Sequence, residues 1–162
     1  MRTATEWFDK YGESHQNKIN KAIHWVAIPT ITLTTLGLFQ SIPHPFGEQL
    51  WLNWATLAVL GAVAFYARIS PTIAVGMAVL AGGMVAFNTW LVSMGAPLLP
   101  LSIGVFFAAW VFQFVGHKIE GEKPSFFEDL QFLLIGPAWL LQFIYKKVGV
   151  PVELDAISRR AA

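Results

Sequence analysis

Long apolar stretches alternate with short segments of turn-forming residues along most of the chain. Four of them, at about 22–40, 50–69, 71–94 and 98–116, approach or exceed the ~20 apolar residues that a helix needs to cross a bilayer. Arg68 is the only formally charged residue within these four stretches. The segments between them carry turn formers such as Pro43, Pro45, Gly95 and Pro97. The pattern predicts an all-α, integral membrane bundle of about four transmembrane helices.

A fifth apolar stretch, 126–145, has a different pattern. Glu128 and Asp129 interrupt its start, and the Gly136-Pro137 pair predicts a break in its middle. The uninterrupted apolar run is too short to span a membrane, which favours a re-entrant or interfacial helical segment at the C-terminal end of the bundle. A full fifth span is the alternative.

We expect one membrane domain over 1–162. Its parts are a cytoplasmic N-terminal segment (1–21), a four-helix transmembrane core (22–117), a re-entrant or interfacial segment (118–146) and a cytoplasmic tail (147–162). Lys and Arg concentrate at the two ends of the chain, and none lies between the first and second spans or between the third and fourth. Because cytoplasmic loops are enriched in Lys and Arg, both termini should be cytoplasmic.

Composition supports a membrane protein and excludes some functions. Hydrophobic residues make up 55% of the chain and charged residues only 13%, so lipid must cover part of the surface. The net charge of +1, without a basic stripe, argues against a nucleic-acid partner. The absence of cysteine excludes disulfides and thiolate metal sites. A homo-oligomer remains possible.

Three of the four histidines fall on the same expected face of the membrane. His15 lies in the N-terminal segment, His24 at the cytoplasmic end of the first span, and His117 at the cytoplasmic end of the fourth. His44 lies in the opposite loop. Ionisable groups at membrane depth are costly unless they are paired or functional, so this grouping points to a site.

Polar residues accompany two of these histidines at helical spacing. The two stripes are Asn17, Asn20, His24 and Gln113, His117, Glu120. Up-and-down helices can bring both stripes together at one depth. The amides of Asn20 and Gln113 could then orient the histidine rings.

Neutral imidazole is the commonest metal ligand, and two or three histidines with a carboxylate suit non-haem iron or zinc. We therefore expect His15, His24 and His117 to bind a metal, with Glu120 as a further catalytic group. His15 and His24 are nine residues apart and would face opposite ways on one straight helix, so joint ligation requires a break between them. Histidines that are merely solvated or hydrogen-bonded are the alternative.

Two sequence blocks carry a family resemblance. Residues 11–29 read YGESHQNKINKAIHWVAIP, and residues 110–137 read WVFQFVGHKIEGEKPSFFEDLQFLLIGP. Both resemble the signature blocks of the fungal 2-hydroxy fatty acid dioxygenases and their bacterial relatives, in the same order and across nearly the whole chain.

The resemblance implies a membrane-bound, iron(II)-dependent dioxygenase of fatty acid α-oxidation. Its substrates would be O2 and a 2-hydroxy fatty acid, which it would shorten by one carbon. By motif position, His15, His24 and His117 would be iron ligands or essential histidines, and Glu120 falls near an acidic position of the family. The membrane would be the inner membrane in a bacterium or the endoplasmic reticulum in a fungus.

Other functions fit the same residues. His24 and His117 could be axial ligands of a haem, or the chain could be a non-catalytic lipid-binding or assembly protein. Four aromatic residues could line a groove for an acyl tail, although packing explains them equally well: Trp25, Phe112, Phe114 and Trp139.

Overall fold

The computed structural model describes residues 2–45 and 51–152, and it contains helices and turns but no strand in these ranges. The helices are α1 (Ala4–Glu13), α2 (Lys18–Gln40), α3 (Trp54–Ile69), α4 (Pro71–Ser93), α5 (Leu98–Glu120), the short 3-10 helix η1 (Ser125–Phe127) and α6 (Phe132–Val148). The all-α prediction is confirmed. Residue 50, where the second span was expected to begin, and residues 153–162 of the expected tail, with Arg159 and Arg160, lie outside the described residues.

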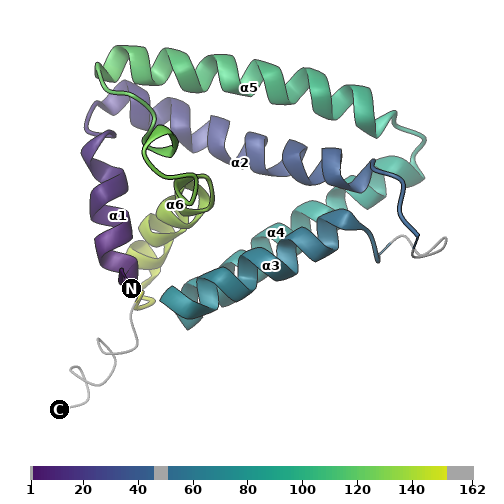
Figure 1. Cartoon of the computed structure of the whole chain (residues 1–162), viewed down its shortest axis with the longest axis horizontal. Helices are drawn as coiled ribbons and strands as arrows, with labels where there is room; N and C mark the ends of the chain where they lie inside the picture. Colours follow the sequence, from purple (N-terminus) through teal and green to yellow (C-terminus); the bar gives the residue numbers. More distant parts are fainter. Residues whose placement is uncertain (1, 46–50, 153–162) are drawn as a thin grey trace.

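The helices form a three-sided frame (Figure 1). Helices α2 and α5 pack side by side along one side, and α3 and α4 form a hairpin along the second. Helices α1 and α6 pack against each other and close the third side, with α6 also touching α4 and α2. The ends of α2 and α5 that carry the histidines therefore lie beside α1 and α6.

Three helices of the described chain are long and apolar enough to cross a membrane: α2, α4 and α5, each of 23 residues. Helix α3 is apolar but has only 16 residues, about 24 Å at 1.5 Å per residue, against a hydrocarbon core of about 30 Å. The structure therefore agrees with a membrane bundle, with α3 as a shorter apolar member.

The sequence patterns did not predict helix α1. Thr3 begins it with a capping box, in which the Thr3 side chain accepts from the Glu6 amide and the Glu6 carboxylate accepts from the Thr3 amide. Its buried face, with Trp7, Phe8 and Tyr11, joins the main hydrophobic core, which also contains much of α6. The end of α1 at Glu13 creates a turn before α2, and this turn carries His15.

The expected break at Gly136-Pro137 is wrong. Helix α6 runs without interruption from Phe132 to Val148, with Pro137 inside it. Proline removes one backbone hydrogen bond, but Pro137 lies only in the second turn of the helix. Gly136 in turn lets Tyr11 and Ile28 approach closely, since a Cβ there would lie 3.1 Å from the Tyr11 hydroxyl. Tertiary packing therefore outweighs the local helix-breaking pair.

Hydrogen bonds from polar side chains join α2 and α4. The Asn88 amide of α4 donates to the Leu33 carbonyl of α2 at 3.1 Å, and Gln40 donates to the Thr89 hydroxyl at 2.8 Å. In an apolar surrounding such bonds between helices resist separation of α2 from α4.

Candidate metal centre

The structure brings together the three histidines singled out in the sequence. His15 lies in the turn between α1 and α2, His24 in the second turn of α2, and His117 in the last turn of α5. All three are buried, with exposed fractions of 0%, 0% and 4%. The break required between His15 and His24 exists, because Asn17 caps α2 with its side chain on the Ile19 amide.

The rings converge on one point. One nitrogen from each of the three rings lies within 4.8 Å of the others. His24 Nε2 and His117 Nε2 are 3.2 Å apart, and the His15 ring centroid is 4.5 Å from that of His24 and 4.9 Å from that of His117. Each pair of rings meets edge to face, with interplanar angles of 78°, 78° and 81°.

Backbone carbonyls fix two of the tautomers. His15 Nδ1 is 2.6 Å from the Tyr11 carbonyl oxygen, and His24 Nδ1 is 2.9 Å from that of Asn20. Because a carbonyl oxygen only accepts, each Nδ1 must carry the proton and donate it. The Nε2 atoms of both rings are then unprotonated and present lone pairs to the cluster.

These nitrogens fit a divalent transition metal. His15 Nε2 is fully buried and has no hydrogen-bond partner in the described part of the chain, which is costly for a polar atom. Imidazole nitrogens bind zinc at about 2.0–2.1 Å, so two nitrogens on one ion lie roughly 3 Å apart, as His24 and His117 do. An ion held at this point would satisfy the buried lone pair of His15 Nε2.

The electrostatics of His15 agree with a ligand role. Burial lowers the pKa of His15 from 6.5 to about 4, although the Tyr11 carbonyl opposes this shift. The imidazole is therefore neutral at physiological pH, which is the form that binds metals. His15 also stacks on the Tyr11 ring at 4.2 Å between centroids, which holds its ring plane.

Glu120 lies beside the cluster but does not belong to the three-nitrogen group. Its carboxylate accepts hydrogen bonds from the backbone amides of Gln16 and Asn17 at 2.7 and 2.9 Å, and from the Asn20 side chain at 2.8 Å. Glu120 therefore ties the end of α5 to the turn that carries His15. This geometry gives it a positioning role.

The two amides predicted to orient the rings differ in their contacts. Gln113 Nε2 lies 2.8 Å from His24 Nε2, and its buried carbonyl oxygen lacks a partner among the described residues. Asn20 reaches the cluster through its backbone carbonyl, which accepts from His24, and through its bond to Glu120. Gln113 is thus the amide that faces the ring nitrogens directly.

Several residues at the site were not predicted from the sequence. The Ser14 hydroxyl lies 3.1 Å from His15 Nδ1 and 2.7 Å from the Ser125 hydroxyl, which links the His15 turn to η1. Trp139 packs 5.3 Å from the His15 ring. A Cβ at Gly116 would lie within 3.0 Å of Asn20 Oδ1, so glycine allows α5 to approach α2 at the cluster. In the sequence, only Gly116 directly before His117 indicated this close approach.

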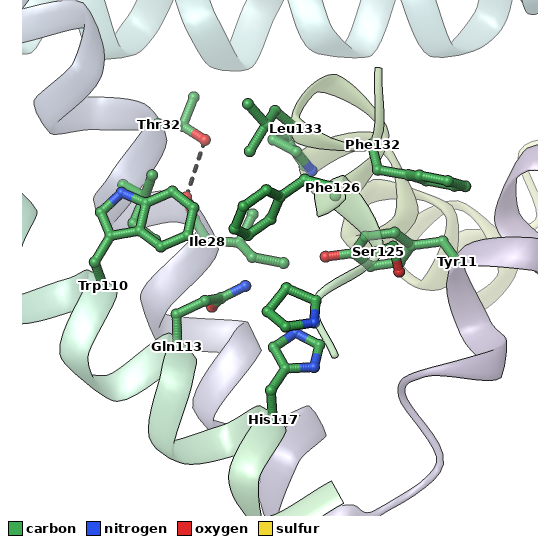
Figure 2. A pocket seen from close by; sticks show the side chains of 14 residues that line it. Tyr11, Ile28, Thr32, Trp110, Gln113, His117, Ser125, Phe126, Phe132 and Leu133 are labelled. Atoms are coloured by element: carbon green, nitrogen blue, oxygen red, sulfur yellow. Dashed lines mark hydrogen bonds between the residues drawn. The ribbon is translucent and has the colours of Figure 1, made fainter. Parts of the chain in front are cut away.

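The cluster lies between a polar cleft and an apolar interior. On one side lies a polar cleft of about 400 Å³ lined by lysines, glutamates and serines: Lys10, Lys123, Glu13, Glu122, Glu128, Ser14 and Ser125. On the other side a small cavity of about 50 Å³ borders His117, Gln113, Trp110 and Ser125. Figure 2 shows the Gln113 and His117 side chains projecting from α5 toward this cavity, with Thr32 and Leu133 at its far side.

Comparisons with known proteins give the family of the chain. A family model described as 2-hydroxy-palmitic acid dioxygenase Mpo1-like matches residues 1–148. The chain belongs to the Mpo1-like family. The 2-hydroxy-palmitic acid dioxygenase MPO1 of Saccharomyces cerevisiae is 29% identical over 142 residues, which cover 85% of this chain and 77% of that protein. No solved structure matches the chain.

Membership of the Mpo1-like family confirms the resemblance seen in the sequence blocks and supports an enzyme of the dioxygenase class. The size of the cavity bears on the haem alternative. The cavity at the cluster measures only about 50 Å³, far below the ~300–1,000 Å³ of ordinary ligand and cofactor sites. A single ion fits this space better than a haem between His24 and His117. His44 precedes α3 in sequence and is not part of the three-nitrogen group.

Proposed function

We propose that this chain is a membrane-bound, iron(II)-dependent dioxygenase that shortens 2-hydroxy fatty acids by one carbon. The observation that carries the proposal is the convergence of three buried histidine nitrogens within 4.8 Å of one another, between a polar cleft and an apolar interior. Membership of the Mpo1-like family, with a relative named for 2-hydroxy-palmitic acid, supports the reaction and the substrate class.

The reaction balances with one molecule of oxygen. The bond between carbons 1 and 2 of the 2-hydroxy acid breaks, and carbon 2 becomes the carboxyl carbon of an acid one carbon shorter. Carbon 1 leaves as carbon dioxide, and the remaining oxygen atom leaves as water. The acid loses four electrons and oxygen gains them. When bound, iron(II) would supply this redox chemistry at positions that a three-histidine site leaves open.

The protein's own residues would hold and shape the site. His15, His24 and His117 would ligate the ion, and the Tyr11 and Asn20 carbonyls would keep the His15 and His24 rings in the ligating tautomer. Because all three rings are buried, bulk water would be kept from the reacting atoms.

Gln113 would orient the substrate. Its buried carbonyl oxygen has no partner within the described residues, and its amide group faces His24. A 2-hydroxyl group could donate to this oxygen, which would satisfy a buried acceptor and select hydroxy acids over plain fatty acids. A site that hydrogen-bonds a substrate hydroxyl discriminates strongly against the analogue that lacks it.

An amphipathic substrate fits the surroundings of the cluster. The carboxylate would approach from the polar cleft, and the tail would remain among the apolar helices. Within this cleft Lys10 is paired with Glu13 and Glu128, so Lys123 is the lysine that would face the carboxylate. The polar cleft and the small cavity share Ser125, so the two meet at the site.

The decisive assay measures oxygen and product together. Purified protein is loaded with iron(II) without air and then given oxygen and 2-hydroxypalmitate, with palmitate as the control substrate. We expect one oxygen consumed for each shortened acid formed, no reaction with palmitate, and loss of both signals in His24→Ala but not in His44→Ala. Folded, iron-loaded protein that consumes no oxygen with a series of 2-hydroxy acids would overturn the proposal and favour a non-catalytic lipid-binding role.

A further inference from the structure

A large apolar channel continues from the small cavity at the histidines. The channel has a volume of about 460 Å³, and its lining comes from α2, α3, α4, α5 and α6. The residues shared by the small cavity and the channel are Ile31, Thr32, Trp110, Leu133 and Pro137. The two spaces are therefore neighbours separated only by these side chains.

These shared residues form the neck between the small cavity and the channel, and Figure 2 labels Thr32, Trp110 and Leu133 among them. Trp110 comes from the same helix as His117 and Gln113, and Thr32 and Leu133 lie on the side of the cavity away from His117. The Thr32 hydroxyl donates to the Ile28 carbonyl at 2.9 Å, so it is satisfied within its own helix and presents its methyl group. The neck is therefore mostly apolar, and the buried indole N–H of Trp110, which has no hydrogen-bond partner among the described residues, is its exception.

We infer that this channel binds the acyl tail of the 2-hydroxy acid, a step that rests on the proposed function. The head would lie at His117 and Gln113, the first part of the tail at the neck, and the end of the tail between α2 and α3. Phe39 at the end of α2, Ile42 just beyond that helix and Ala58 of α3 line the distal part.

The dimensions agree with a lipid tail. Thr32 at the neck and Phe39 near the distal end are seven residues apart on α2, about 10 Å at 1.5 Å per residue. One leaflet of the ~30 Å hydrocarbon core is about 15 Å thick, so this length corresponds to a large part of a lipid tail. The channel volume also lies within the ~300–1,000 Å³ that small-molecule sites occupy.

A second apolar groove provides the contrast. It measures about 560 Å³ and lies between α2 and α5, where Ile19, Ala22, Ala108 and Phe112 line it. It shares no lining residue with the small cavity at the histidines. Of the aromatic residues suggested in the sequence as a tail groove, Phe112 lines this outer groove, Trp25 and Phe114 are exposed, and Trp139 is buried beside His15. None of these four lines the channel.

The channel predicts an effect of tail length. Transfer of a tail from lipid into an apolar channel gains little, since both surroundings are apolar, so selectivity must come from the space available. Ala58→Phe would fill the distal end. We expect acids long enough to reach Ala58 to bind about tenfold or more weakly, from the cost of overpacking, and shorter acids to bind as before. The matched control is Ala108→Phe, which fills the outer groove and should change neither.

Photo-crosslinking tests the inference without any substitution. The probe is a 2-hydroxy fatty acid with a diazirine near the tail end, used on the unmodified protein with and without iron(II). We expect the label on α3 and on the C-terminal half of α2, with competition by unlabelled 2-hydroxypalmitate. A label confined to the outer groove, or a channel in which a phospholipid remains bound at saturating 2-hydroxy acid, would overturn the inference.

The two proposals can fail separately. A channel label on protein that never consumes oxygen would leave the channel standing and overturn the proposed reaction. Oxygen-dependent shortening with a label only in the outer groove, and with no change of length preference in Ala58→Phe, would leave the reaction standing and overturn the channel.

Discussion

The closest approach of α5 to α2 at the metal centre depends on one glycine. A Cβ at Gly116 would lie within 3.0 Å of Asn20 Oδ1 and 3.5 Å from His24 Cε1. Asn20 is fully buried, and its amide is committed to Glu120, so it has little freedom to move aside. Gly116→Ala should therefore push apart the two helices that carry His24 and His117.

A matched glycine on the same helix sets the scale. A Cβ at Gly104 of α5 would meet nothing within 4 Å, so Gly104→Ala should gain helix propensity alone, up to ~1 kcal/mol. Gly116→Ala makes the same gain but adds an overpacking cost of ~1–3 kcal/mol. We expect the free energies of unfolding of the two variants to differ by about 1–3 kcal/mol. Disturbing groups that support metal ligands typically lowers metal affinity by ~10–100-fold, and we expect Gly116→Ala to fall in that range.

The assay combines unfolding in detergent with iron(II) titration for the wild type, both alanine variants and Gly116→Ala/Asn20→Ala. The double variant removes the overlapping oxygen, so the two substitutions should not be additive. Gly104→Ala should keep the wild-type affinity for iron(II). Equal effects of Gly116→Ala and Gly104→Ala on stability and on metal binding would refute the close approach of the two helices at the site.

Three further predictions follow from single side chains. Glu120→Gln should weaken iron(II) binding by ~10–100-fold, because it loses the charge-assisted hydrogen bonds to the His15 turn. Titration with iron(II) measures this effect against a Glu122→Gln control, and equal affinities of the two variants would contradict the positioning role. Gln113→Leu should retain iron(II) but lower kcat/KM for 2-hydroxy acids, and an unchanged kcat/KM would argue against its contact with the hydroxyl. Burial lowers the pKa of His15 from 6.5 to about 4, so the folded metal-free protein binds this proton less readily than the unfolded chain. The contribution of His15 to the free energy of unfolding should be constant above pH 6.5 and fall by up to about 3 kcal/mol as the pH is lowered toward 4. Thermal unfolding that shows no such dependence on pH, or the same dependence in His15→Asn, would contradict this.

Much of the fold was predictable because lipid imposes a simple rule. Apolar stretches of about 20 residues must be helical, since no water is present to satisfy the backbone. The grouping of His15, His24 and His117 was also predictable, because the distribution of Lys and Arg placed them on one face before any contact was known.

The details of the site were not predictable, because they depend on contacts between distant parts of the chain. The Tyr11 carbonyl reaches His15 only because α1 ends at Glu13, and the Thr3-to-Glu6 capping box marks only where α1 begins. The continuity of α6 through Pro137 depends on packing around Gly136. The apolar channel draws its lining from five helices, and no single helix pattern encodes it.

The metal content of the purified protein tests the proposed three-histidine iron site most directly. We would load the protein with iron(II) in detergent, remove excess ion, and measure bound iron for the wild type and for His15→Ala, His24→Ala, His117→Ala and His44→Ala, with circular dichroism to show that each is folded. We expect one iron per chain in the wild type and in His44→Ala, and loss of that iron in each of the other three variants. Folded wild-type protein that binds no iron, or retention of iron in all three cluster variants, would contradict the proposed site.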